Sequence, residues 1–468
     1  MATVLLLVIA AYGFASAEGP KAKASFCNLT DAEIAGVSVD ASVSIHAIPA
    51  YRDIVRGLFQ AGRFAQLDCL AESVRSRKET FSGGLWKIHT FYKALEKPPL
   101  HATQEDWDGH MQLLNRWMST NPESITARIA LAESYVSYGW DARGAGYADT
   151  VSGSGWKLLE ERAAKAKQIL DEAATPSAKD PEWYVAMQQV ALAQGWDKGA
   201  TRSLLEQAVR FEPTYYYYYR EYAYSIMPRW GGEEGEVDQF LTKTADNLGG
   251  DTGDMLYFRV ATYLICDRCD DSKRLKVSWR RIQKGFVAVE KHDGPSPVNW
   301  NVLAHMGAMF MDPEVANQMF ARIGDEWDEE IWQTSSYFES TKQWAKQVEP
   351  FMVANQAAEK SAEANLQTTE GQRYKMAFDE KIHSWMQPCV EGLAGSFLGN
   401  FELLIKVGKE GTIEYLTGRG YSPVMACLGP KLDNFRMSKQ DVFPATPQPD
   451  YWVRFDFNPE KVDLNAQK

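Results

Sequence analysis

The chain has 468 residues, of which 45% are hydrophobic and 24% charged, and its formal net charge is −12. This composition is typical of folded globular proteins and excludes a chain that is disordered throughout. The acidic balance disfavours nucleic acid as a partner, because such a protein repels phosphate backbones.

The N-terminus has the layout of a cleavable secretory signal peptide. An apolar run over Val4–Phe14 is too short to span a bilayer, and three small residues follow it. Only the α-amino group supplies positive charge before this run. We predict a signal peptide at residues 1–17, cleavage after Ala17, and a periplasmic or secreted protein without a stable membrane span. A fraying N-terminal helix of a cytosolic protein is the alternative.

The six cysteines fit an oxidising compartment, in which disulfides form and persist. We predict pairing between neighbours along the chain: Cys27 with Cys69, Cys266 with Cys269, and Cys389 with Cys427. The spacing of Cys266 and Cys269 also matches redox and zinc motifs, so a thiol redox protein that uses this pair is an alternative function. A zinc site would need a second Cys or His pair at short spacing, and the sequence contains none.

Residues 51–348 show helical spacing of apolar residues almost throughout. One such stripe consists of Leu159, Ala163, Ala166 and Leu170. Asp180 before Pro181 is typical of a helix start, where a capping side chain precedes a proline in the first turn. Alternation of the strand type is nearly absent, so we predict a mostly α domain over residues 18–348.

Short motifs recur in this region near the period of the helix-turn-helix tetratricopeptide unit. The sequence Gly195–Asp197 repeats Gly139–Asp141, and Trp196 and Trp230 lie 34 residues apart. One helix pair cannot bury its apolar face by itself, whereas stacked pairs share a continuous core. We therefore predict a tetratricopeptide-like array of antiparallel helical hairpins. Its periodic aromatic residues, Trp196 and Trp230 included, are expected first of all in the core.

The pattern changes twice toward the C-terminus. Residues 349–388 are rich in Ala, Gln, Glu and Lys, which predicts a polar helical linker. Beyond it, apolar and polar side chains alternate at period two around a glycine-containing turn, as in a β-hairpin. We predict a small α+β domain over residues 389–468, made of a hairpin, a short helix and a third strand at 401–415, 424–435 and 451–457.

Several motifs between Leu131 and Gly232 occur together in one known family. They are Ala132–Tyr135, Gly139–Gly144, Tyr147–Val151, Asp180–Tyr184, Gln194–Asp197, Tyr215–Tyr219 and Pro228–Gly235. With these motifs the segment at about 130–270 resembles the bacterial domain of unknown function 4034 family. The resemblance implies a helical tetratricopeptide-like fold and no particular reaction.

The C-terminal segment carries a weaker resemblance. Its hairpin turn Gly408–Gly411, its Cys427-bearing helix and its final strand after Phe443-Pro444 are similar to the C-terminal domain of the TonB energy-transducer family. The resemblance implies a small α+β module in the periplasm that binds protein partners. We expect the fold and the compartment to carry over but not energy transfer, because the sequence shows no membrane anchor and no long Pro-rich spacer.

Catalytic motifs are absent from the sequence. It contains no nucleophile elbow, no P-loop, no H-E-x-x-H zinc motif and no calcium loop, and no two of its seven His lie four residues apart. We therefore predict no cofactor, no metal and no catalytic residue. An enzyme with its site at the glycine-rich loop 143–155 is an alternative, with Asp141, Arg143, Asp149 and Arg229 as its polar groups.

Aromatic residues beside arginines favour a recognition surface, because they bury much area at a low cost in side-chain entropy. Five consecutive tyrosines, Tyr215–Tyr219, would point all round a helix, so we expect some of them outside the core. In a curved helical array the concave face would collect such residues into a groove for a protein or peptide partner. The candidate binding residues are Trp140, Asp141, Arg143, Tyr216, Tyr219, Arg220, Arg229 and Trp230. An exported binding or scaffolding protein is thus the first hypothesis, and plain packing is the alternative for each residue.

Overall fold

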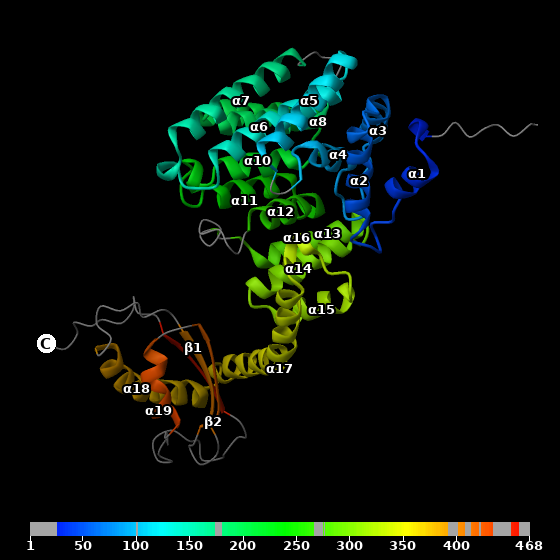
Figure 1. The fold of residues 1–468 in the computed structure, drawn as a ribbon. Helices are drawn as coiled ribbons and strands as arrows, with labels where there is room; N and C mark the ends of the chain where they lie inside the picture. The colour runs from blue at the N-terminus through cyan, green and yellow to red at the C-terminus, as the bar shows by residue number, and fades with distance from the viewer. Residues whose placement is uncertain are drawn as a thin grey trace, which may run out of the picture. The chain divides into compact units, whose positions relative to one another are not determined.

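The fold was analysed in a computed structural model of the chain (Figure 1). It describes residues 26–99, 102–173, 180–265, 275, 277–391, 401–407, 413–420, 423–433 and 451–457. The predicted signal peptide and the pair Cys266 and Cys269 lie outside these residues. The described part is mostly helical and divides into two compact units: Met1–Phe310 with Met319–Gln333, and Met311–Gln318 with Thr334–Lys468.

The first unit begins with helices that pack on their neighbours along the chain. They are α1 (Asp31–Val37), α2 (Ala47–Gln60), α3 (Phe64–Ser76), α4 (Lys87–Leu95), α5 (Gln104–Thr120), α6 (Ile125–Arg143) and α7 (Gly153–Glu172). Short 3-10 helices η1 (Phe26–Asn28) and η2 (Ala148–Thr150) precede α1 and α7. Helix α6 contacts α3, α4, α5, α7 and α8, and it is therefore buried on most of its faces.

The unit continues with a second series of helices. They are α8 (Pro181–Ala193), α9 (Lys198–Phe211), α10 (Tyr217–Ser225), η3 (Pro228–Trp230), α11 (Glu236–Leu248), α12 (Gly250–Leu264), α13 (Trp279–Asp293), α14 (Pro297–Met309) and α16 (Glu329–Trp332), while α15 (Pro313–Ile323) runs across the division between the units. Consecutive helices again pack together, among them α8 with α9, α11 with α12 and α12 with α13.

The predicted helix start at Asp180 and Pro181 is confirmed. The Asp180 carboxylate accepts a hydrogen bond from the backbone N–H of Glu182 at 2.9 Å, and Pro181 occupies the first turn of α8. Other helices start in the same way, with Ser124 capping α6 and Ser152 capping α7. Local sequence thus fixes where these helices begin.

The tyrosine run Tyr215–Tyr219 corrects an expectation. All five side chains are buried, with exposed fractions between 0% and 5%, so none of them leaves the core. The reason is the position of the run at the start of α10, a helix that contacts α8, α9, α11 and α12. Two of their hydroxyl groups donate internally, Tyr216 to Tyr217 at 2.9 Å and Tyr215 to the carboxylate of Glu182, whereas the buried hydroxyl group of Tyr218 has no hydrogen-bond partner among the described residues.

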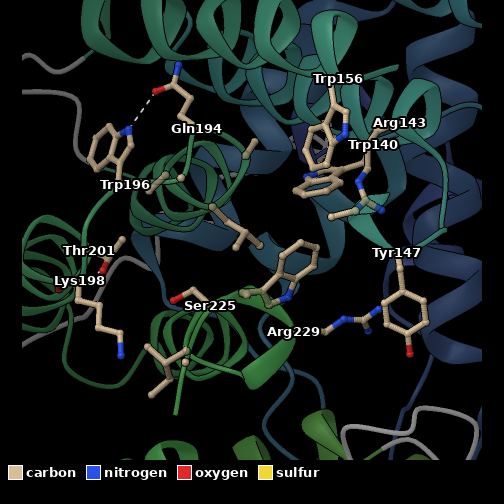
Figure 2. A pocket seen from close by; sticks show the side chains of 18 of the residues that line it. Trp140, Arg143, Tyr147, Trp156, Gln194, Trp196, Lys198, Thr201, Ser225 and Arg229 are labelled. Atoms are coloured by element: carbon tan, nitrogen blue, oxygen red, sulfur yellow. Dashed lines mark hydrogen bonds between the residues drawn. The ribbon is translucent and has the colours of Figure 1, made fainter. Parts of the chain in front are cut away.

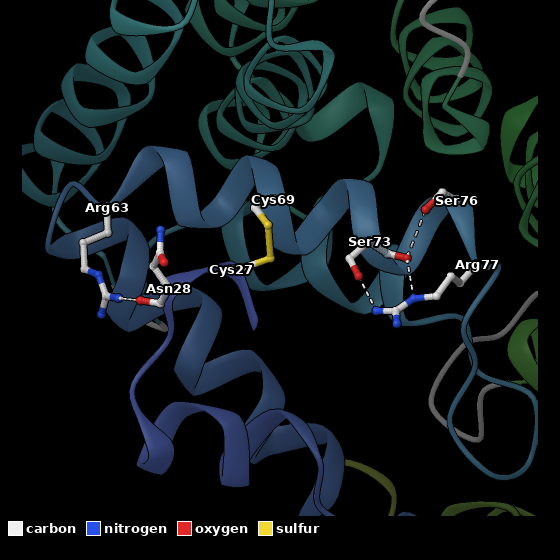
Figure 3. The surroundings of a disulfide bond; sticks show 7 residues. All are labelled: Cys27, Asn28, Arg63, Cys69, Ser73, Ser76 and Arg77. Atoms are coloured by element: carbon white, nitrogen blue, oxygen red, sulfur yellow. Dashed lines mark hydrogen bonds between the residues drawn. A yellow bond between two sulfur atoms is a disulfide. The ribbon is translucent and has the colours of Figure 1, made fainter. Parts of the chain in front are cut away.

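Two of the three predicted cysteine pairs lie at disulfide distance. Cys27 in η1 joins Cys69 in α3 (Figure 3), and Cys389 joins Cys427 in the second unit. Beside the first pair, Arg63 donates to the carbonyl oxygen of Asn28 at 3.0 Å (Figure 3). These contacts tie the first described residues to α3.

The second unit contains an antiparallel sheet with strand order β2-β1-β3. Its elements are α17 (Ser335–Leu366), α18 (Thr369–Glu391), β1 (Phe401–Val407), β2 (Ile413–Gly420), α19 (Pro423–Asp433) and β3 (Tyr451–Phe457). Residues 349–388, predicted as a polar helical linker, belong to α17 and α18 and are helical except at 367 and 368, between the two helices.

The two long helices cover opposite faces of this sheet. Leu404 packs against Ala358 and Ala362 of α17. Phe455 lies on the other face, and its ring centroid is 5.6 Å from that of His383 in α18. Consecutive residues of a strand point to opposite faces. This is why Leu403 and Leu404 are both buried.

None of the described helices combines the length and the apolarity that crossing a bilayer requires.

Candidate functional site

The first unit contains a cavity of about 490 Å³ that five aromatic side chains line, and we call it the aromatic cavity. These side chains are Trp140, Tyr147, Trp156, Trp196 and Trp230. Three cations, Arg143, Lys198 and Arg229, line it as well, and no Asp or Glu is among its lining residues. Figure 2 shows Arg143, Tyr147 and Arg229 on one side of the cavity and Trp196 and Lys198 on the other.

A second cavity of about 640 Å³ adjoins the first, and we call it the charged cavity. Its charged lining residues balance: they are Lys93, Arg143, Arg229, Glu96, Asp141 and Glu221. Trp140 and Trp230 line both cavities, and their rings meet edge to face with centroids 5.4 Å apart. This tryptophan pair therefore stands at the boundary between the two cavities.

A third cavity of about 730 Å³ lies beyond Lys93, which also lines the charged cavity. Phe59 of α2, Pro98 and His110 of α5 form part of its wall. The three cavities thus adjoin in the order aromatic, charged, third.

Arg143 organises the loop that closes the aromatic cavity. It is the last residue of α6, and its Nη1 atom donates to the carbonyl oxygens of Gly144 at 3.0 Å and Gly146 at 2.5 Å. Gly144 has a φ of 77°, a left-handed conformation that glycine adopts without strain and that turns the chain out of the helix. The Arg143 guanidinium also lies over the rings of Trp156 and Trp140, 4.9 and 5.7 Å from their centroids. One side chain thus holds both the loop and the aromatic wall.

Arg229 and Trp230 are presented by the tight turn at η3. A Cβ atom at Gly232 would overlap the carbonyl oxygen of Ile226, so the turn can close this tightly only with glycine there. Trp230 is half-buried, and its ring lies 5.8 Å from that of Tyr224. Its indole N–H is buried and has no hydrogen-bond partner within the described part of the chain.

Lys93 and Glu96 form an ion pair at the wall of the charged cavity. Their charged atoms are 2.9 Å apart, and Glu96 also accepts a hydrogen bond from Ser137 at 2.6 Å. Burial lowers the pKa of Lys93, but the surrounding carboxylates, Glu96 foremost, raise it by more, so this pKa lies well above its usual range. Lys93 is therefore a cation and not a general base near neutral pH.

Fully buried carboxyl groups lie behind this ion pair. Burial raises the pKa of Glu182 to about 8, and burial together with the nearby Glu182 raises that of Glu133 well above its usual range. The Nδ1 atom of His89 lies 2.9 Å from Glu182, and burial followed by the charge of Lys93 lowers the pKa of His89. Glu182 and His89 are thus mostly neutral at pH 7, and they belong to the core of the first unit.

The structure brings five of the eight candidate binding residues together. Trp140, Asp141, Arg143, Arg229 and Trp230 line the two adjoining cavities. The other three lie elsewhere. Tyr216 and Tyr219 are buried in the core, and the Nε atom of Arg220 donates to the carbonyl oxygen of Arg259 at 3.0 Å, joining α10 to α12.

Sequence reasoning missed several residues of the site. Lys93 and Glu221 come from α4 and α10, and only the tertiary structure brings them beside α6. Tyr147 lies in the glycine-rich loop 143–155 and Trp156 directly follows it, so their aromatic character beside this loop could have indicated them. Trp196 and Trp230, expected in the core, are half-buried and line the aromatic cavity.

The four polar groups that the enzyme alternative requires do not all line one cavity. Asp149 lies exposed in η2 and lines neither the aromatic nor the charged cavity, whereas Asp141, Arg143 and Arg229 do line the charged cavity. Within the described residues, no group of three or more His, Cys, Asp or Glu side chains could hold a metal ion. Comparisons of the chain with family models, with curated proteins and with solved structures find no match.

Proposed function

We propose that this chain is a binding protein that holds an extended segment of a partner polypeptide in the groove formed by the three adjoining cavities. The observation that carries the proposal is that neighbouring cavities share lining residues. Trp140 and Trp230 belong to the first two, and Lys93 belongs to the second and third. A ligand that extends from one cavity into the next therefore contacts the residues that the two cavities share.

The chemistry of the groove suits a peptide. Aromatic side chains provide flat apolar contact area, and tryptophan and tyrosine also offer a hydrogen-bond donor to a peptide carbonyl group. Cations and carboxylates both line the charged cavity, where Lys93, Glu96, Glu221 and Arg229 can pair with side chains of either sign. Interface hot spots are enriched in tryptophan, tyrosine and arginine, the residue types that gather here.

The proposal extends to the fold and the compartment. We infer that residues 18–348 form a tetratricopeptide-like array, as in the domain of unknown function 4034 family, because helices that follow one another pack on one another from α5 to α13 with few exceptions. Export is supported by the cysteine pairs Cys27–Cys69 and Cys389–Cys427, since disulfides persist in oxidising compartments. The sheet β2-β1-β3, with α19 between β2 and β3 in the sequence, supports a small α+β module similar to the TonB C-terminal domain.

Site-specific photocrosslinking tests the groove. The crosslinking residue p-benzoylphenylalanine is placed at Tyr147, which lines the aromatic cavity, and in a matched control at Val287 of α13. Both side chains are 63% exposed, so a difference in crosslinking between the two positions reflects where they lie and not how accessible they are. We expect irradiation in the native cells to link Tyr147 to one short segment of one protein, identified by mass spectrometry, and Val287 to nothing specific. Equal products at both positions, or none at Tyr147, would contradict the proposal.

A further inference from the structure

The aromatic cavity has a charge that the rest of the chain does not lead one to expect. The protein carries a net charge of −12, yet this cavity is lined by three cations and by no carboxylate. Lys198 is paired with Glu236 at 2.7 Å, so part of its charge is compensated. Arg143 donates only to two backbone carbonyl oxygens, and no carboxylate of the described residues pairs with it.

Two buried N–H groups at this cavity are also unused. The Nε1 atom of Trp230 and the Nε atom of Arg143 have no hydrogen-bond partner in the part of the chain that the structure describes. A buried donor without an acceptor costs free energy, and a ligand oxygen that reaches it removes this cost. The cavity thus combines the guanidinium group of Arg143, which pairs with no carboxylate of the described residues, with two unsatisfied donors, and both features favour an anionic oxygen ligand.

We propose that the aromatic cavity binds a carboxylate of the partner segment, either the side chain of Asp or Glu or the C-terminal carboxylate, next to an aromatic residue. This proposal rests on the peptide-binding function proposed above. Arginine binds carboxylates through paired, charge-assisted hydrogen bonds, and Arg143 and Arg229 lie on the same side of the cavity (Figure 2). The rings of Trp140, Trp156 and Trp196 offer flat surfaces to the neighbouring aromatic side chain.

The neighbouring cavity gives the bound segment a direction. The charged cavity favours a carboxylate less, because the carboxylates of Glu96, Asp141 and Glu221 match its cations, whereas no carboxylate lines the aromatic cavity. The carboxylate therefore occupies the aromatic cavity, and the rest of the segment runs past the Trp140–Trp230 pair toward Lys93.

Three small probes test the carboxylate and separate its two sources. They are N-acetyl-Gly-Phe with a free C-terminus, its C-terminal amide, and N-acetyl-Asp-Phe amide, each titrated into the full chain by calorimetry and by saturation-transfer NMR. We expect at least one carboxylate-bearing probe to bind roughly ten-fold or more tightly than the neutral amide, as removal of a charged hydrogen bond requires. Tighter binding of N-acetyl-Gly-Phe indicates a chain terminus, and tighter binding of N-acetyl-Asp-Phe amide indicates a side chain.

Charge-neutral variants locate the bound carboxylate. We expect R229Q to weaken the binding of the favoured probe roughly ten-fold. R210Q is the matched control, because Arg210 is exposed on α9, the helix of Lys198, and does not line the aromatic cavity. It should leave the dissociation constant unchanged.

Four outcomes separate failure of this proposal from failure of the peptide groove. Equal affinity for the amide and the carboxylate probes overturns the carboxylate proposal and leaves the groove standing, as does equal weakening by R229Q and R210Q. A crosslink at Tyr147 together with no binding of any probe also overturns the carboxylate proposal and supports the groove. Carboxylate-selective binding without any polypeptide crosslink supports an anion site and overturns the peptide groove.

Discussion

Asp180 shows how one residue can serve both a helix end and the core. Its side chain is fully buried, caps α8, and also pairs with Arg75 at 2.6 Å and accepts a hydrogen bond from Tyr92 at 2.8 Å. These partners lie on α3 and α4, more than 80 residues earlier in the chain. The same carboxylate that marks a helix start in the sequence therefore links three helices in the structure.

Replacing Asp180 by Ala should destabilise the protein by about 3 kcal/mol, because it removes the buried partner of Arg75, which keeps only the exposed carboxylate of Glu72, and also removes a helix cap. Urea unfolding followed by circular dichroism measures this loss. The control is E206Q, which removes an exposed pair with Arg202 at 3.3 Å and should cost no more than about 0.5 kcal/mol. Similar losses in both variants would refute the role assigned to Asp180.

Trp117 and Trp230 allow packing and recognition to be told apart. Trp117 is fully buried and stacked on Phe64, whereas Trp230 is half-buried at the boundary of two cavities. We expect W117A to cost about 3–5 kcal/mol, and W230A to cost only about 1–2 kcal/mol because less of its surface is buried. The binding of the carboxylate probe that the wild type favours should be lost in W230A, as measured by calorimetry below the unfolding temperature of the variant. Unchanged binding would mean that Trp230 has only a structural role.

Among the elements, α10 shows most clearly that burial depends on neighbours. Its first three residues, Tyr217–Tyr219, end a run of five tyrosines that has no apolar face to indicate which side is buried. Contacts with α8, α9, α11 and α12 bury these three residues, whereas Glu221 and Tyr224 of the same helix line the charged cavity. The tyrosines are thus part of the core that positions η3 and, with it, Arg229 and Trp230.

The tight turn after α10 can be tested by substituting Gly232. A side chain at Gly232 would overlap the backbone of Ile226, so G232A should force the turn open, lower the stability by about 1–3 kcal/mol and weaken probe binding. The matched control is G57A in α2, where a Cβ atom would meet no neighbour among the described residues. This variant should raise the free energy of unfolding by about 0.5–1 kcal/mol, because Ala favours a helix interior over Gly. Thermal unfolding and calorimetry on both variants check the pair. A stable, fully binding G232A protein would show that the turn adapts.

At the scale of the whole molecule, the buried carboxyl groups make stability depend on pH. The pKa of Glu182 is raised from 4.5 to about 8 in the folded protein. The folded state therefore keeps a proton that the unfolded chain releases, so the contribution of Glu182 is fully present below pH 4.5 and is lost as the pH rises toward 8.

The variant E182Q cannot lose this proton. Its stability relative to the wild type should therefore rise between pH 5 and pH 8, by up to about 1.4 kcal/mol per pH unit. Urea unfolding at a series of pH values measures the difference between the two proteins. E206Q, at an exposed position, should follow the wild type at each pH. A constant difference between E182Q and the wild type would show that Glu182 is ionised in the folded state.

Local features were predictable from the sequence because their causes are local. The spacing of apolar residues indicated helices over 51–348, Asp180 and Pro181 marked the start of α8, and period-two alternation indicated the strands β1 and β3. The pairs Cys27–Cys69 and Cys389–Cys427 followed from proximity along the chain. Each of these signals depends on residues a few positions apart or on short loops, where backbone geometry and chain entropy act directly.

Only the tertiary structure decided which residues meet at the cavities. Trp140, Asp141 and Arg143 come from the end of α6, but Lys93, Trp196, Glu221 and Trp230 reach them from other parts of the chain. It also decided that the tyrosines of α10 are buried while Trp196 and Trp230 remain accessible. The physical reason is that burial and charge compensation depend on every element packed around a side chain. Helical periodicity indicates only which face of a single helix is apolar, and not which elements pack on it.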